Sequence, residues 1–341
     1  MHYAVTSTLS AEFTGRTEAL LKRTRLLSAH GKFPAAIIST DYNPDLNSVY
    51  KLYYEKALIP KQVQFLNIYD FLSKRTYDVR EIEHPLEEKG LVWSAVENGK
   101  AYRYFDNGKY VLYKNYETPD KRLKFIDMLD PYQHKRKVRK EYNCAGLCHK
   151  EIHYRQGTVY VLEEIYLDEL GKAYLNKMYD GTSEQKLQSI YVFQDGKALE
   201  FQSETEWIRF CLGQMIEAHS TVVCDERLLD RPVLEMEVPK VKKILFLQHL
   251  ELNSVEHSFC RYTRDHLDQI DELVVLTNEQ KEVLREALPH IGKVTVILHS
   301  PEEADESMGA PYSDALFLQA WRSLLKAPKP ASPFNKFFRR A

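Results

Sequence analysis

The chain has 341 residues, 44% of them hydrophobic, and a net charge of −2 at neutral pH. This length suits about two domains, and the near-neutral charge gives no overall field that would attract nucleic acid. Five cysteines in a chain of this size argue against a disulfide scaffold and are typical of a reducing compartment. No apolar run approaches the roughly 18 residues of a membrane-spanning helix, and we expect no signal peptide. The predicted location is therefore cytoplasmic, with at most peripheral contact at the inner face of the membrane.

The first 75 residues alternate short apolar runs with helical stretches. The apolar runs predict strands at residues 3–6, 35–39 and 63–67. After Gly15, the spacing of Leu20, Thr24 and Leu27 predicts a helix that stops near Gly31. This βαβαβ order implies a parallel sheet with right-handed crossovers.

The pattern changes over residues 76–200. Short alternating runs are separated by Asn-Gly, Asp-Gly and similar dipeptides, as where Asn107-Gly108 lies between the runs 101–105 and 110–113. Such dipeptides between alternating strands are strong hairpin signals. We therefore predict an inserted antiparallel β domain.

Buried-strand runs alternating with helices return after residue 200. A helical stretch at 203–218 precedes apolar runs at 221–225, 244–247, 272–276 and 294–297. Thr277 and Gln280 have the spacing of a capping box and predict a helix over 278–287, and a last apolar helix is expected over 313–325. The predicted fold is an α/β Rossmann-like domain of residues 1–75 and 201–326, interrupted by the β domain.

The segment 327–341 holds several prolines and is predicted to be a disordered tail. It ends in a basic aromatic stretch, Phe334–Arg340, which is a weak indication of contact with an anionic membrane.

Four segments together carry a resemblance: the loop 13–17 before a helix with Lys22-Arg23, the β-rich insertion, the strand 244–247 followed by Gln248-His249, and Asp271–Lys281 (DELVVLTNEQK). Their order resembles the N-terminal half of the retaining glycosyltransferases that decorate wall teichoic acid. These poly(glycerol-phosphate) and poly(ribitol-phosphate) glycosyltransferases belong to glycosyltransferase family four and have the GT-B fold. The resemblance implies an acceptor polymer at the N-terminal half, UDP-sugar at the C-terminal half, and assembly into trimers through residues 76–200.

The candidate acceptor or phosphate-binding residues are Gly15, Arg16, Thr17 and His249. A glycine before a helix lets the backbone approach a phosphate at the helix N-terminus, although Gly15 can equally be a turn glycine, and Thr14 stands where the family has a first glycine. His249 follows a predicted strand at the edge where open α/β sheets bind ligands. It either bonds a sugar hydroxyl or acceptor phosphate or is a satisfied, partly buried histidine.

Two other groups of residues have competing interpretations. Arg16, Lys22 and Arg23 either meet a polyanion or are ordinary solvated helix charges. The run Cys144-x3-Cys148-His149-x3-His153 has a spacing that zinc tolerates. It lies in a predicted β region where such residues need not converge, so we predict packing and no metal.

The catalytic signature of the family is not found. Its members carry a Glu-x7-Glu pair in the C-terminal half, where basic residues also neutralise the departing diphosphate, and no two glutamates of this chain are eight positions apart. The stretch after Leu298 is also too short for a second domain. We therefore expect a truncated glycosyltransferase-like protein of cell-surface glycosylation that lacks the donor half, with no catalytic residue and no cofactor of its own. It would bind the polymer or a full-length glycosyltransferase partner.

Two alternatives remain open. The chain could be an active hexosyltransferase whose UDP-sugar site a partner chain completes, or a non-catalytic oligomerisation scaffold.

Overall fold

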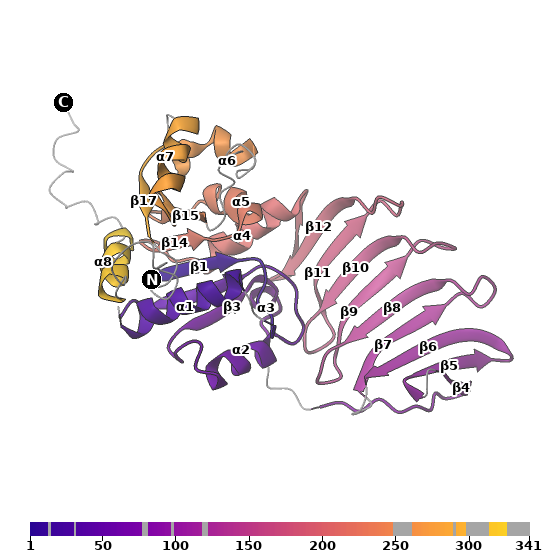
Figure 1. The fold of residues 1–341 in the computed structure, drawn as a ribbon. Helices are drawn as coiled ribbons and strands as arrows, with labels where there is room; N and C mark the ends of the chain where they lie inside the picture. Colours follow the sequence, from indigo (N-terminus) through magenta and orange to yellow (C-terminus); the bar gives the residue numbers. More distant parts are fainter. Residues whose placement is uncertain are drawn as a thin grey trace. The chain divides into compact units, whose positions relative to one another are not determined.

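The computed structural model describes residues 1–12, 15–30, 32–76, 81–96, 99–117, 122–247, 261–288, 291–297 and 314–325. The chain forms two compact units, both visible in Figure 1. Unit 1 contains Met1–Asp41, Ser48–Ile68 and the chain from Ile208 onward, and unit 2 contains Tyr42–Asn47 and Tyr69–Trp207. The sequence placed the boundaries after residues 75 and 200, whereas the contacts change unit after Ile68 and after Trp207.

Unit 1 is built on a parallel sheet with the described strand order β17-β16-β15-β14-β1-β2-β3. The strands are β1 (His2–Thr6), β2 (Ala35–Ser39), β3 (Gln64–Asn67), β14 (Thr221–Cys224), β15 (Lys242–Leu247), β16 (Glu272–Val275) and β17 (Val294–Val296). The chain winds outward from β1 to β3 and then returns to β14 on the other side of β1. The strand order therefore reverses between β1 and β14, as in doubly wound Rossmann folds, and the predicted fold class is confirmed.

Helices connect or follow these strands. They are α1 (Arg16–Ala29), α2 (Leu46–Glu55), α3 (Ile68–Ser73), α4 (Glu204–Met215), α5 (Asp230–Leu234), α6 (Arg261–Asp265), α7 (Asn278–Ala287) and α8 (Asp314–Leu324). The predicted capping box of α7 is confirmed. The backbone N–H of Gln280 donates to Thr277 Oγ1 at 3.1 Å, and the backbone N–H of Thr277 donates to Gln280 Oε1 at 3.2 Å. Within the described residues, no helix combines the length and apolarity needed to span a bilayer. Gly31 and the tail 327–341 lie outside the described residues.

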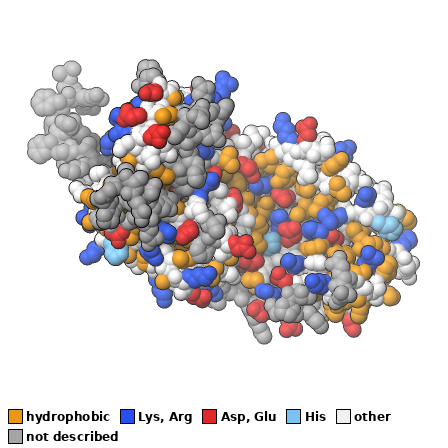
Figure 2. All heavy atoms as spheres, in the orientation of Figure 1, with side chains coloured by type: hydrophobic (Ala, Val, Ile, Leu, Met, Phe, Trp, Pro, Cys, Tyr) orange, Lys and Arg blue, Asp and Glu red, His pale blue; other side chains and the backbone are white. Residues whose placement is uncertain are grey.

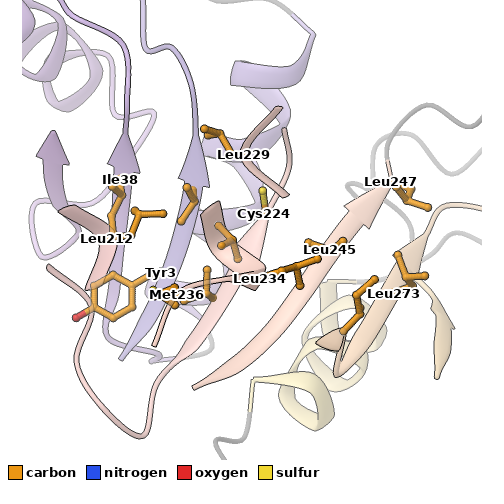
Figure 3. Packing of buried hydrophobic residues seen from close by; sticks show 14 of the residues in the cluster. Tyr3, Ile38, Leu212, Cys224, Leu229, Leu234, Met236, Leu245, Leu247 and Leu273 are labelled. Carbon is orange, nitrogen blue, oxygen red and sulfur yellow. The ribbon is translucent and has the colours of Figure 1, made fainter. Parts of the chain in front are cut away.

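The sheet of unit 1 is buried on both faces, which explains its continuous apolar strands. Successive residues of one strand face opposite ways, so Leu245 of β15 belongs to the same core as Leu212 of α4, whereas its neighbour Phe246 belongs to the core that contains Trp321 of α8. Figure 3 shows the first of these two cores, in which Tyr3, Leu245 and Leu273 come from separate strands. The second core lies between the sheet, α1 and α8.

Unit 2 is an antiparallel meander in which each strand pairs with the next along the chain. Its strands are β4 (Val92–Val96), β5 (Ala101–Asp106), β6 (Lys109–Glu117), β7 (Arg122–Leu129), β8 (Arg136–Tyr142), β9 (Cys148–Tyr154), β10 (Val161–Leu167), β11 (Ala173–Tyr179), β12 (Leu187–Gln194) and β13 (Lys197–Phe201). The predicted turn at Asn107-Gly108 joins β5 and β6, with φ of 47° and 79° at its two residues. Two positive φ values are the requirement of a type I′ hairpin turn, so the dipeptide predicted this turn correctly.

Candidate functional site

The carboxyl ends of β1 and β14 form the switch point of the sheet in unit 1, where folds of this kind bind ligands. The loop that follows β1 begins with Ser7, whose carbonyl accepts hydrogen bonds from the Thr40 and Asp41 amides at 3.0 and 2.8 Å. Farther along the loop, the Tyr53 hydroxyl donates to the Ser10 carbonyl at 2.6 Å. These bonds attach the described part of the loop to the end of β2 and to α2, and so fix its position before α1.

Gly15 is the N-cap residue that precedes α1, and it has φ 52° and ψ −112°, a backbone conformation that residues with a Cβ rarely adopt. No atom of the described residues would come within 4 Å of a Cβ placed there. No side chain of the described residues caps this end of the helix. The first-turn amides of Arg16 and Thr17 are therefore not satisfied by a capping side chain, and such a helix N-terminus favours anions.

Glu226 brings three distant segments together at this point. Its carboxylate accepts a hydrogen bond from Ser7 Oγ at 3.3 Å and pairs with Nη1 of Arg16. The Glu226 side chain is 13% exposed, whereas that of Arg16 is 44% exposed and keeps donors open to solvent. A guanidinium, a carboxylate and a hydroxyl therefore lie together beside the N-terminus of α1.

A fully buried ion pair supports this arrangement from beneath. Arg23 Nη2 lies 2.7 Å from Asp225 Oδ2, and neither side chain is exposed. The Arg23 guanidinium lies over the rings of Phe246 and Trp321, at 5.0 and 5.4 Å from their centroids. Burial raises the pKa of the Asp225 carboxyl above its ordinary value, and the charge of Arg23 opposes that rise. Because Asp225 precedes Glu226, the pair fixes the backbone that presents the Glu226 carboxylate.

The structure corrects the interpretation of Arg23, which the sequence placed either at a polyanion or in solvent. It is neither, because this residue points into the core between α1, α8 and the sheet. Its neighbour Lys22 pairs with Glu18 at 3.3 Å along the surface of α1. Arg16 alone of the three combines an exposed guanidinium with a place at the switch point.

Arg227 joins the carboxyl ends of β14 and β15. Its Nη2 donates to the carbonyls of Cys224 and Phe246 at 3.1 and 3.0 Å, and its Nη1 lies 3.1 Å from Asp230. Burial raises the pKa of the Asp230 carboxyl to about 6, against the opposing charge of Arg227. These contacts hold β14 and β15 in register where the site begins.

His249, Phe13 and Thr14 lie outside the described residues, so the predicted role of His249 stays a prediction. The sequence analysis also missed Ser7 and Glu226. A signal for Glu226 existed, because an acidic pair directly follows the buried run 221–224 at the carboxyl edge of the sheet. No local pattern marked Ser7, whose role depends on the approach of β14.

The cysteine and histidine side chains in and just before β9 do not gather into a set of metal ligands. The Nδ1 atom of His149 lies 2.6 Å from the Tyr42 hydroxyl, and burial lowers the pKa of this imidazole to about 3. The Nε2 atom of His153 lies 3.6 Å from Glu151. Within the described ranges, no three His, Cys, Asp or Glu side chains are grouped so as to hold a metal ion.

Comparison with solved structures identifies proteins of the same fold. One match is TarM of S. aureus, solved as a point mutant in complex with fondaparinux, α-GlcNAc-glycerol and UDP. It has a TM-score of 0.72 and 17% identity to this chain, and the match covers 87% of this chain and 61% of TarM. The pneumococcal O-GlcNAc transferase GtfA, in complex with UDP and GlcNAc, matches with a TM-score of 0.64 and 13% identity, over 88% of this chain and 60% of GtfA. The described residues thus form a single lobe of the GT-B type with an inserted β domain.

The sequence resemblance is thus confirmed at the level of the fold, which is all that identities this low establish. The chain spans less than two thirds of the length of these two proteins. No protein-family model matches the sequence, and no curated protein matches it either.

Proposed function

We propose that this chain is the acceptor-binding part of a glycosyltransferase of cell-surface glycans, and that it holds a polyol-phosphate polymer of the teichoic acid type. The observation that carries the proposal is the grouping of Arg16, Glu226 and Ser7 at the switch point of unit 1. The shared fold with TarM and GtfA supports the class of reaction.

The chemistry of the site suits a polymer in which phosphates alternate with hydroxyl-bearing carbons. A phosphate would meet the Arg16 guanidinium and the first-turn amides that follow Gly15, because both favour anions. A neighbouring polyol hydroxyl would donate to the Glu226 carboxylate or bond Ser7 Oγ. One repeat of the polymer would therefore satisfy the cationic and the acidic half of the site together.

The proposal assigns no catalytic residue to this chain. The Glu-x7-Glu pair of the family has no counterpart in the sequence, and a departing nucleotide diphosphate needs preorganised cations. Sugar transfer would then require a UDP-sugar site from outside these residues, and a full-length glycosyltransferase partner is one way to provide it.

Calorimetry with glycerol-phosphate oligomers and, in parallel, UDP-sugars tests the proposal. We expect the oligomers to bind, and Arg16→Gln to weaken binding by about 10- to 100-fold, the worth of a charge-assisted hydrogen bond. Glu226→Gln should weaken binding as well, because it removes the carboxylate that holds the Arg16 guanidinium in place and accepts the polyol hydroxyl. Arg285→Gln is the matched control, since Arg285 is similarly exposed (54%), pairs with Glu282 and lies on α7. Equal losses from Arg16→Gln and Arg285→Gln would refute a specific site.

The same assay separates the alternatives. Oligomer binding without turnover fits the proposal, whereas sugar transfer that starts when a full-length partner is added fits an active enzyme completed by that partner. Binding of UDP-sugar by the chain alone, lost on Arg16→Gln, would contradict the assignment of the switch point of unit 1 to the acceptor. Binding of neither ligand would leave only a scaffold function.

A second candidate function is assembly into homo-oligomers, including trimers, through unit 2. The strand β4 forms one edge of the ten-stranded sheet, and its Val92 and Trp93 side chains are 73% and 41% exposed. Exposed apolar edge strands pair readily with another chain. Light scattering should give a mass of three chains for the wild type and of one chain for Val92→Lys. A monomeric wild type would rule this function out.

A further inference from the structure

A hollow on one face of the sheet in unit 2 combines tyrosine rings with fixed cations. It has a volume of about 340 Å³ and lies over β6 to β9, the strands labelled in Figure 1. Its rings come from Tyr110, Tyr113 and Tyr154, and its cationic side chains include Lys135 and Arg136. This volume is at the small end of the range of about 300–1,000 Å³ that ligand pockets occupy.

The register of the strands gathers these side chains. Tyr113 of β6 lies opposite Asp127 of β7, and Asp127 lies opposite Arg139 of β8, so all three project from the same face. The space-filling view in Figure 2 shows Lys and Arg side chains interleaved with hydrophobic ones over the strands of unit 2.

Two arginines share a single carboxylate here. Asp127 is 5% exposed and accepts two hydrogen bonds from Arg139, at 2.7 and 2.9 Å, and it lies 3.0 Å from Arg136 Nε. Arg136 Nη1 also donates to the Tyr154 hydroxyl at 3.1 Å. The three charged groups therefore carry one unbalanced positive charge, and Arg136 remains 34% exposed at the hollow.

Both guanidinium groups lie over aromatic rings. The carbon of the Arg139 guanidinium lies 3.8 Å from the Phe125 centroid, and that of Arg136 lies 5.1 Å from the Tyr154 centroid. An arginine fixed in this way loses little side-chain entropy when it binds an anion. The group is preorganised to take up a charged ligand.

The adjacent turn adds positive charge to the hollow. Lys135 lines it and is exposed, while Asp130, at the start of the same turn, is already paired. Asp130 accepts the amides of Tyr132 and Gln133, both at 3.0 Å, and pairs with Lys137 at 3.3 Å. These two backbone hydrogen bonds lower the pKa of the Asp130 carboxyl. An incoming anion therefore meets the Lys135 ammonium beside a carboxylate whose charge is already compensated.

We propose that this hollow in unit 2 binds a sugar that carries a phosphate, with the tyrosine rings against the sugar and Arg136 and Lys135 on the phosphate. Aromatic side chains provide a large flat surface with a polar tip, and a guanidinium fork matches two phosphate oxygens. The site belongs to unit 2 and does not depend on the acceptor site proposed for unit 1.

The test uses the full chain carrying Arg16→Gln, which removes the phosphate contact proposed in unit 1. Glucose 1-phosphate, inorganic phosphate and methyl glucoside are titrated separately, and binding is followed by calorimetry and by the NMR signals of the arginine side chains. We expect glucose 1-phosphate to bind about tenfold more tightly than either of the other probes, because only it uses rings and cations together. Phosphate binding as tight as that of glucose 1-phosphate would overturn the proposal, since the rings would then contribute nothing.

Three variants locate the binding. Arg136→Gln should weaken glucose 1-phosphate by about tenfold or more, and Lys135→Gln, which removes an exposed side chain and is not expected to disturb folding, should weaken it several-fold. Lys172→Gln removes the same charge from an exposed position in the turn between β10 and β11 and should have no effect. Equal losses from Lys135→Gln and Lys172→Gln would refute the site, as would unchanged binding in both lining variants.

Discussion

Replacing Arg23 with methionine should strongly destabilise unit 1. The substitution leaves the Asp225 carboxylate fully buried without its counter-ion, and breaking a buried pair from one side costs about 3–5 kcal/mol. The contacts of the guanidinium with Phe246 and Trp321 are lost as well. With an m value of about 2 kcal/mol/M, we expect the urea midpoint to fall by about 2 M, measured by circular dichroism and tryptophan fluorescence.

Two companion variants make this experiment decisive. Lys22→Met changes the neighbouring charge on α1, whose pair with Glu18 is partly exposed, and should alter stability by less than about 0.5 kcal/mol. The double variant Arg23→Met with Asp225→Leu removes both charges and should regain most of the lost stability, because apolar replacements of buried pairs are often neutral or better. A loss below about 1 kcal/mol in Arg23→Met, or a double variant no better than the single one, would refute the reasoning.

The pH dependence gives an independent check on the same pair. Burial already raises the pKa of Asp225, and Arg23→Met removes the charge that opposes this rise. The folded carboxyl then binds a proton more tightly than the unfolded one, so the variant gains stability relative to the wild type as the pH falls. The difference in unfolding free energy between the two proteins should therefore be smaller at pH 5 than at pH 7. A difference that widens on acidification would contradict the assignment.

Three further outcomes are expected. Gly146→Ala would place a Cβ 2.2 Å from the Ile82 carbonyl oxygen, whereas the Cβ of Gly171→Ala, at nearly the same φ (77° against 78°), would meet no atom of the described residues within 4 Å. Calorimetric unfolding should show Gly146→Ala to be at least about 1 kcal/mol less stable than Gly171→Ala. Burial lowers the pKa of His149 to about 3, so its ring signals in NMR should keep their neutral positions from pH 8 to pH 5. Its folded pKa lies below the unfolded value of about 6.5, so this residue removes about 1.4 kcal/mol of stability per pH unit below 6.5, and a His149→Gln variant should show a shallower decline. Trp321→Ala should lower the urea midpoint of unit 1 by about 1.5–2.5 M, equivalent to about 3–5 kcal/mol. Leu316→Ala changes an exposed position of the same helix. A smaller loss of stability in Trp321→Ala than in Leu316→Ala would disprove the role of the Trp321 ring in the core.

The strands and the order of the fold could be predicted because the information is local. The sheet of unit 1 is buried on both faces, so most of its strands contain a short continuous apolar run, as at 35–38 and 273–275. The hairpins of unit 2 depend on dipeptides that alone tolerate two positive φ values, such as Asn107-Gly108. The helix α7 was predicted to the residue because its capping box joins positions three apart in the sequence.

The candidate site was harder to predict because its contacts are long-range. Glu226 meets Arg16 across 210 positions of sequence, and Arg23 meets Asp225 across 202. A charged residue in a helix is normally assigned to solvent. Only the approach of β14 and α8 to α1 makes Arg23 a core residue, and no spacing within α1 reports this.

The buried pair gives the C-terminal helix an influence on the candidate site. Trp321 of α8 lies against the Arg23 guanidinium, Arg23 pairs with Asp225, and the next residue is Glu226, which holds Arg16. Each step is a direct contact or a peptide bond. Loss of the Trp321 ring should therefore loosen Arg23 and Asp225, and with them the position of the Arg16 guanidinium. Trp321→Ala should then weaken oligomer binding even at a temperature where unit 1 remains folded, whereas Leu316→Ala should leave it unchanged. Energetic coupling between distant groups is carried by chains of packed side chains. Equal oligomer affinity in Trp321→Ala and wild type would show that α8 has no influence on the site.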